Sequence, residues 1–183
     1  MRVISGIAKS TKLETLDTIE TRPTLDRVKE ALFNIIQSQI YDSVVLDLFS
    51  GSGALGIEAL SRGAKKAVFC DNSKEAYNII KKNLSKTRLE TKASVYNNNY
   101  DVCLNNLKDK FDIVFLDPPY NTDFVINAIS KILDKNLLSD DGIVIVETDK
   151  EEKIIAGITK MQVYDIRKYG RAKLVFLKRK EQV

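Results

Sequence analysis

Two apolar segments of the chain each end abruptly in residues that do not suit a protein core. The first, residues 44–49, contains Asp47 and runs into the glycine-rich stretch 50–56. A glycine loop between a strand and a helix lets backbone N–H groups approach a small molecule closely. The second, residues 113–116, runs into Asp-Pro-Pro-Tyr at 117–120. A carboxylate, a stiff backbone and an aromatic face make a poor structural element but a good clamp for a planar amine.

The glycine loop leaves more than one ligand open. Gly51, Gly53 and Gly56 fit the dinucleotide-binding pattern G-x-G-x-x-G, and Asp71 lies 20 residues after Gly51, where a carboxylate can bind a ribose. A nicotinamide-dependent oxidoreductase is therefore one interpretation, and a tight turn without a ligand is another. Asp47 argues against a dinucleotide, because a pyrophosphate gains nothing from an added negative charge. The acid suits a cofactor with an ammonium and a sulfonium, which is S-adenosylmethionine.

The second motif is suited to the exocyclic amine of a nucleobase. Such an amine can donate one hydrogen to the Asp117 carboxylate and the other to the carbonyl of Pro118, while Tyr120 offers a stacking face worth about 1–3 kcal/mol. The two acceptors draw the nitrogen lone pair out of ring conjugation and stabilise the positive charge that develops on nitrogen. The motif therefore predicts methyl transfer to a base nitrogen without a metal.

Strands and helices are expected to alternate along the chain. The expected strands are 44–49, 67–70, 93–96, 112–116 and 142–147, followed by an antiparallel hairpin of 161–167 and 173–178. The expected helices are a segment that begins at Thr24 or Asp26 and continues to Ile40, then 54–61, 74–84, 102–107 and 124–133. This pattern predicts an α/β fold with a doubly wound, Rossmann-like sheet, mostly parallel but with a C-terminal antiparallel hairpin strand.

The same pattern predicts one domain over residues 1–183. Residues 1–22 form an N-terminal arm or hairpin with short strands at 2–5 and 12–16, and residues 23–183 form the core. Ligands of open α/β sheets bind at the carboxyl ends of the strands. Polar or aromatic residues follow four of the expected strands, so we expect them to share one edge.

Composition and charge exclude several classes of function. The chain has no His, so a Ser-His-Asp triad, a His base and His metal sites are ruled out. Its 29 Lys and Arg against 25 Asp and Glu give a net charge of +4, which is compatible with an anionic partner. The two cysteines are expected to be free thiols. No signal-like or membrane-spanning apolar run is seen, so we expect a cytoplasmic protein without membrane contact.

Several longer stretches are similar to one known family. They are Arg2–Gly6, Arg22–Phe33, Asp47–Ala64, Leu116–Tyr120 and Lys168–Arg171. Over these stretches the chain resembles, nearly end to end, the RsmD family. That family consists of class I S-adenosylmethionine-dependent methyltransferases that modify the N2 amine of one guanine in bacterial 16S ribosomal RNA. The Arg-Pro-Thr stretch and the extended glycine motif are specific, whereas Asp-Pro-Pro-Tyr is shared with adenine and cytosine enzymes.

The resemblance implies a role for individual residues. Those implied to bind S-adenosylmethionine are Asp47, Ser50, Gly51, Gly53, Gly56, Asp71, Asn72, Asn99 and Tyr100. Those implied to hold the flipped target guanine and act in catalysis are Asp117, Pro118 and Tyr120. Those implied to contact RNA are Arg2, Arg22, Thr24, Arg27, Pro119 and Arg171. The chain departs from the family at Asn99, where related enzymes often have an acid, and at 6–10, where a Trp- and Arg-bearing stretch is usual.

The expected partner is 16S ribosomal RNA or an assembly particle of the small subunit, and the expected state is a monomer without a metal. An adenine-N6 methyltransferase on DNA or RNA is the alternative within the same class. A cofactor-binding module without activity is a further alternative.

Overall fold

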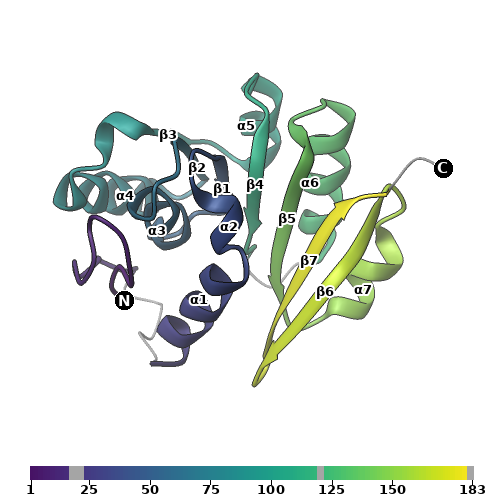
Figure 1. The fold of residues 1–183 in the computed structure, drawn as a ribbon. Coiled ribbons are helices and arrows are strands. Elements are labelled where there is room, and N and C mark those ends of the chain that lie inside the picture. Colours follow the sequence, from purple (N-terminus) through teal and green to yellow (C-terminus); the bar gives the residue numbers. More distant parts are fainter. Residues whose placement is uncertain (17–22, 119–121, 181–183) are drawn as a thin grey trace.

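The sheet at the centre of the molecule has seven strands in the order β3-β2-β1-β4-β5-β7-β6 (Figure 1). The structure is a computed structural model that describes residues 1–16, 23–118 and 122–180, without the side chains of 23–25 and 122. Five strands run parallel, and β7 lies antiparallel to both of its neighbours. The strands are β1 (Val44–Leu48), β2 (Lys66–Asp71), β3 (Ala93–Asn97), β4 (Phe111–Leu116), β5 (Leu138–Thr148), β6 (Met161–Tyr169) and β7 (Ala172–Arg179).

Helices cover both faces of the sheet and divide the core into two. The helices are α1 (Pro23–Ile35), α2 (Gln37–Ile40), α3 (Ala54–Ser61), α4 (Lys74–Thr87), α5 (Tyr100–Asn106), α6 (Thr122–Asp134) and α7 (Glu151–Gly157), with a 3₁₀ turn η1 at Glu90–Lys92. Buried side chains of α1, α3 and α4 form one apolar cluster with the sheet, and those of α5, α6 and α7 form the other. The sheet is therefore doubly wound, as the sequence pattern predicts.

Strand alternation decides which face each site residue occupies. Successive side chains of a strand point to opposite faces. Ile113 and Phe115 of β4 belong to the α1/α3/α4 cluster, whereas Val114 and Leu116 belong to the α5/α6/α7 cluster. The same alternation in β1 places Asp47, two residues after Val45, on the face covered by α1 and α3.

The N-terminal arm differs from its expected form. The strands expected at 2–5 and 12–16 are absent, and the arm has a single antiparallel bridge between Arg2 and Lys12. A ladder does not extend because the N–H groups of Ile4 and Ser5 donate to the Glu58 carboxylate of α3 instead of to a neighbouring strand. Val3, Ala8 and Leu13 are nonetheless buried in the cluster under α1 and α3.

Other expected elements are confirmed with changed boundaries. The C-terminal hairpin pairs as expected, with Tyr169 opposite Ala172. The first helix ends at Ile35, and a separate short helix, α2, covers the end of the segment expected to be helical. Helix α7 is not predicted because its seven residues are too few to show a helical period. In the described part of the chain, no helix is long and apolar enough to cross a bilayer.

Candidate active site

Asp47 is a buried acid at the start of the glycine loop. Its side chain is 3% exposed, and its carboxylate accepts the Gly56 N–H at 2.9 Å. Burial raises the pKa of Asp47 to about 7, the Gly56 hydrogen bond opposes this shift, and the negative charge of Asp71 adds to it. A carboxyl held in this way is ready to pair with a cation that enters the loop.

The loop after β1 is shaped by left-handed backbone. Phe49, Gly51 and Gly53 have φ values of 71°, 54° and 76°. The Ser50 hydroxyl donates to the Asp47 carbonyl and accepts the Cys70 N–H at 2.9 Å, which ties the loop to β2. A Cβ added at Gly51 would meet nothing within 4 Å, so the space beside this glycine is open.

Gly56 has a packing role that is visible without any ligand. A Cβ at this position would lie 2.3 Å from Cε1 of Phe69. Helix α3 can therefore approach β2 only because residue 56 is glycine. The role in cofactor binding expected for Gly56 remains a prediction beside this structural one.

Asp71 is the last residue of β2, and its carboxylate binds backbone N–H groups of two neighbouring loops. Its two carboxylate oxygens accept the Gly51 N–H at 2.8 Å and the Ser73 N–H at 2.9 Å. The amide of Asn97 donates to the carbonyls of Asp71 and Asn72, both at 3.1 Å, and so joins β3 to this loop. Asn97 was predicted only as one of the polar residues at this edge, and its contact with the loop after β2 was not predicted.

Asn99 and Tyr100 begin helix α5. The side-chain oxygen of Asn99 accepts the Val102 N–H at 2.9 Å, so it caps the helix. The Tyr100 ring lies 5.4 Å from Phe49 and 5.5 Å from Phe124, centroid to centroid. These three rings form an aromatic cluster beside the strand ends, and two of its members, Phe49 and Phe124, were not predicted. Phe49 is the last residue of an apolar segment and Phe124 is the first residue of an expected helix, so both are typical of core residues in the sequence.

Asp117 follows β4 and is exposed to solvent at its side chain. Partial removal from water raises the pKa of Asp117, and the negative charges of Glu147 and Asp47 add to this shift. Glu147 is partly buried near the end of β5, and burial raises its pKa as well. Glu147 was not predicted as a site residue, because it is the final residue of an expected strand and has no motif around it.

The carboxyl groups of Asp47, Asp117 and Glu147 therefore lie together at one edge of the sheet. None of them has a described ion pair, and no cation contributes to their pKa shifts. Among the residues that the structure describes, no three Cys, Asp or Glu side chains are close enough to hold a metal ion. The arrangement is suited to an organic cation and to amine donors.

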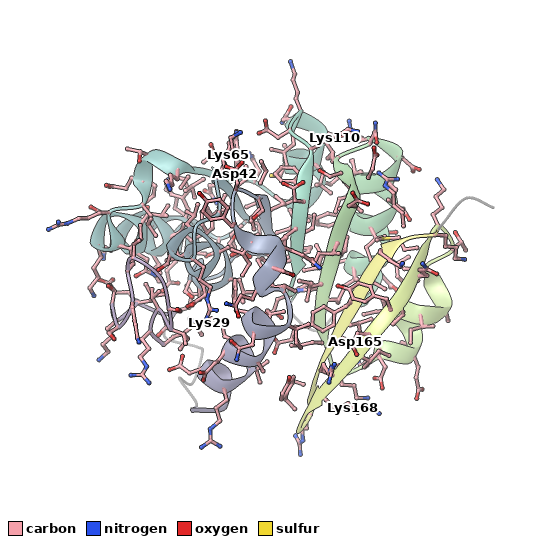
Figure 2. All side chains as sticks on the ribbon, viewed as in Figure 1. Lys29, Asp42, Lys65, Lys110, Asp165 and Lys168 are labelled. Atoms are coloured by element: carbon pink, nitrogen blue, oxygen red, sulfur yellow. The ribbon has the colours of Figure 1, made fainter. Side chains whose placement is uncertain are left out.

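Basic residues surround this edge in two groups. Arg2, Lys9 and Arg27 line a hollow between the arm and α1, and Arg2 lies 3.9 Å from Asp26. Arg171 is exposed in the turn between β6 and β7, and Figure 2 shows Lys168 at the tip of the same hairpin. The register of Thr148 with Lys173 places this tip beside the end of β5.

Several expected site residues are not covered by this description. Arg22, Pro119 and Tyr120 lie outside the described residues, and so does the side chain of Thr24. Pro118 is described and is partly buried. The structure thus brings Asp47, Asp71 and Asp117 to one edge but leaves the stacking ring expected at Tyr120 as a prediction.

Comparisons with known proteins extend over nearly the whole chain. The family described as "Conserved hypothetical protein 95" matches residues 1–178. Ribosomal RNA small subunit methyltransferase D of Haemophilus influenzae is 40% identical over 158 residues, which cover 85% of this chain and 82% of that protein. The protein of the same name from Escherichia coli is 37% identical over 151 residues, covering 82% and 76%. The solved structure of yhhF from Escherichia coli has a TM-score of 0.87 at 30% identity and covers 100% of this chain and 99% of that one.

Proposed function

The chain belongs to the RsmD family of class I methyltransferases, and on that premise we propose that it methylates the exocyclic N2 amine of a guanine in 16S ribosomal RNA. One observation carries the proposal. The glycine loop with Asp47 and the acid Asp117 follow the adjacent strands β1 and β4, whose register pairs Asp47 with Phe115. The loop that would bind the cofactor therefore lies beside the residues that would hold the amine.

The residues present fit S-adenosylmethionine. This cofactor, when bound, supplies the electrophilic methyl group. Asp47 is a buried carboxyl without a cationic partner among the described residues, and the open space at Gly51 leaves room for a ligand beside it. Asp47 would hold the ammonium end, and Asp71 would accept hydroxyl hydrogens of the ribose. Tyr100, with Phe49 and Phe124, offers flat faces for the adenine.

The target amine would be held by the residues after β4. The Asp117 carboxylate accepts one hydrogen of the amine, and the Pro118 carbonyl accepts the other. These acceptors hold the nitrogen lone pair toward the methyl group and stabilise positive charge on the nitrogen as it forms. A guanine must leave its stack to reach this position. The basic residues of the arm and of the hairpin tip would contact phosphates and orient the RNA without reading its sequence.

The proposal is tested by the product itself. We expect 16S ribosomal RNA from cells lacking the gene to lose N2-methylguanosine at one nucleotide, as measured by nucleoside mass spectrometry with mapping. Reintroducing the wild-type gene restores the modification, and the Asp117→Ala gene does not. The matched control is Asp101→Ala, which removes an exposed acid that pairs with Lys131 on the surface.

Two outcomes favour other functions. An unchanged N2-methylguanosine level with reduced N6-methyladenine supports the adenine alternative, because the amine clamp alone does not distinguish the two bases. Restoration by Asp117→Ala supports a binding module without activity. Family membership speaks against the nicotinamide-dependent oxidoreductase, and calorimetry with S-adenosylhomocysteine and NAD in parallel tests that point directly.

A further inference from the structure

The ends of β4 and β5 place two acids side by side on one face of the sheet. The register pairs Phe115 with Ile145 and Leu116, the last residue of β4, with Val146. Asp117 follows directly after this ladder, beside Glu147, whose charge acts on it. Phe115 and Ile145 both belong to the cluster under α1 and α3. Side chains two residues further on return to the same face. Asp117 and Glu147 therefore extend from neighbouring strands toward the same side.

Both acids are accessible to a ligand. Asp117 is exposed, Glu147 is partly buried, and no hydrogen bond or ion pair to either carboxylate is described. Their proximity is also felt electrostatically, because the charge of Glu147 raises the pKa of Asp117. Adjacent strands lie about 4.8 Å apart, so the two carboxylates can converge on neighbouring N–H groups of one base.

We propose that Glu147 determines the choice of base by accepting the N1–H of guanine while Asp117 accepts the N2 amine. This inference rests on the proposed function and deepens it. An ionised carboxylate can only accept hydrogen bonds. Guanine presents two adjacent donors, N1–H and N2–H, and satisfies both acids. Adenine presents an N1 lone pair next to its amine, and cytosine an N3 lone pair, so either base would leave Glu147 unpaired and repelled.

An unpaired buried or half-buried carboxylate makes the wrong base costly to bind. Hydrogen bonds to charged groups are stronger than those between neutral groups, and a site built for a donor discriminates against a base that lacks it. Glu147 thus acts as a specificity-determining residue, whereas Asp117 holds the reacting nitrogen. The two roles predict different effects of substitution.

The test uses the full-length protein and a 16S ribosomal RNA substrate in which the mapped target guanosine is replaced by 2-aminopurine riboside. This base keeps the N2 amine but has a lone pair at N1 and no N1–H. We expect the wild-type kcat/KM to be about 10- to 100-fold higher for guanine than for 2-aminopurine. Glu147→Gln, whose amide can donate to N1, should lower this ratio about tenfold or more. The control Asp141→Asn removes an exposed acid from the other end of β5 and should leave the ratio unchanged.

Each outcome decides one point. Equal wild-type activity on the two bases overturns the inference without any variant, so it does not depend on whether Glu147→Gln folds. Equal loss on both bases in Glu147→Gln, with S-adenosylhomocysteine binding retained, overturns it as well, because a merely structural role predicts that result. Absence of any N2-methylguanosine from the wild-type reaction contradicts the proposed function instead, and the two failures are therefore distinguishable.

Discussion

Asp117 is the residue on which methyl transfer depends most directly. Asp117→Asn keeps the size of the side chain and one acceptor oxygen but removes the negative charge. We expect kcat to fall about 100-fold or more, because charge stabilisation at the reacting centre is lost. S-adenosylhomocysteine affinity, measured by calorimetry, should change little. A variant with normal kcat would contradict the role of Asp117 as the amine acceptor.

We expect the buried carboxyl of Asp47 to lower the free energy of unfolding of the ligand-free protein. Its folded pKa of about 7 lies above the ordinary 3.8, so between these values the folded state binds more protons than the unfolded state. The free energy of unfolding contributed by Asp47 therefore falls as the pH rises through this range.

Asp47→Asn removes this titration and can still accept the Gly56 N–H. We expect the variant to be more stable than the wild type at pH 8, by up to about 4 kcal/mol, and similar to it near pH 4. Urea unfolding at the two pH values measures the difference. Cofactor affinity should fall in the same variant, because the acid that pairs with the ammonium is gone. If the free energy of unfolding of the wild type increased from pH 4 to pH 8, the predicted direction of this pH dependence would be wrong.

Individual site residues could be predicted where the residue type is unusual for its position in the expected strand or loop. Asp47 and Asp117 stand out because an acid interrupts or ends an apolar strand. Glu147 also ends an expected strand, but no glycine or proline follows it. That it lies near Asp117 becomes clear only from the register of β5 with β4. The aromatic cluster of Phe49, Tyr100 and Phe124 is likewise a product of tertiary packing and could not be found from spacing.

The contact of α3 with β2 limits what can replace Gly56. A methyl group at this position meets the Phe69 ring at 2.3 Å, so Gly56→Ala must shift the helix or the ring. We expect a loss of about 1–3 kcal/mol in the free energy of unfolding, measured with urea. The double variant Gly56→Ala/Phe69→Leu should recover part of the loss, since Leu is shorter than Phe. Additive effects of the two changes would contradict a direct clash.

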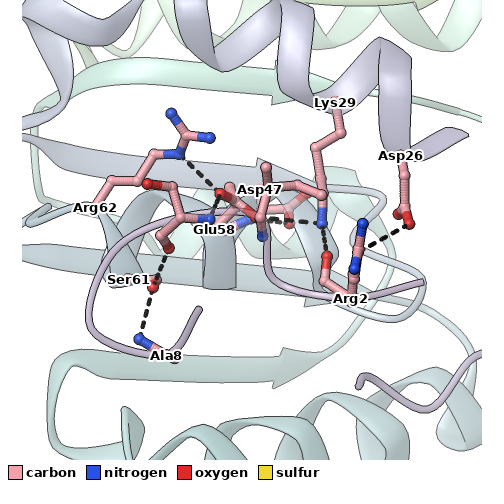
Figure 3. A network of polar contacts seen from close by, with 11 residues as sticks. Arg2, Ala8, Asp26, Lys29, Asp47, Glu58, Ser61 and Arg62 are labelled. Carbon is pink, nitrogen blue, oxygen red and sulfur yellow. Dashed lines mark hydrogen bonds and ion pairs between the residues drawn. The ribbon is translucent and has the colours of Figure 1, made fainter. Parts of the chain in front are cut away.

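A buried ionic network holds the N-terminal arm against α3 (Figure 3). Glu58 is fully buried; its oxygens lie 3.3 Å from the Lys29 amine and 2.8 Å from Arg62 Nε, and they also accept the N–H groups of Ile4 and Ser5. Lys29 is 4% exposed and donates to the Arg2 carbonyl. Desolvation lowers the pKa of Lys29, and Glu58 opposes that shift.

Breaking this network should release the arm. In Glu58→Gln the buried Lys29 loses its counter-charge, and we expect a loss of about 3–5 kcal/mol of stability. Hydrogen exchange at the amides of Ile4 and Ser5 should become faster. The control Glu14→Gln breaks an exposed pair with Lys82 and should cost less than about 1 kcal/mol. Equal effects of the two substitutions would show that burial does not strengthen the network.

The elements of the sheet were largely predictable, whereas the arm was not. Residues 113–116 form a continuous apolar run in an expected strand, and polar and apolar residues alternate in the hairpin 161–178. The arm has no such period, because its backbone N–H groups bind a side chain of α3 that lies more than fifty residues away in sequence. Long-range side-chain acceptors of this kind leave no local pattern.

Basic and acidic residues lie in different regions around the site. The net charge is +4, and exposed basic residues lie on the arm and at the hairpin tip. The acids of the site lie between them at the ends of β1, β4 and β5. An anionic polymer such as RNA is therefore attracted to the basic arm and hairpin tip. Cationic groups and hydrogen-bond donors are favoured beside the acids at the strand ends.

This division predicts that cofactor binding releases protons. At pH 7 Asp47, the acid proposed to pair with the ammonium, has a pKa of about 7 and is about half protonated. A cationic ligand stabilises the ionised form of Asp47, so binding should release up to about half a proton at pH 7. S-adenosylmethionine affinity should then increase by up to about tenfold per pH unit between pH 6 and 8.

Calorimetry in buffers with different ionisation enthalpies measures this release. S-adenosylhomocysteine lacks the sulfonium charge, so it should release fewer protons than S-adenosylmethionine at the same pH. Asp47→Asn should also release fewer. Asp165→Asn removes an acid of the hairpin that pairs with Arg167, and it should behave as the wild type. Binding heats that are the same in every buffer would mean that the acids are already ionised without the ligand. In that case the acids would act as fixed negative charges, and the affinity for S-adenosylmethionine would not change between pH 6 and 8.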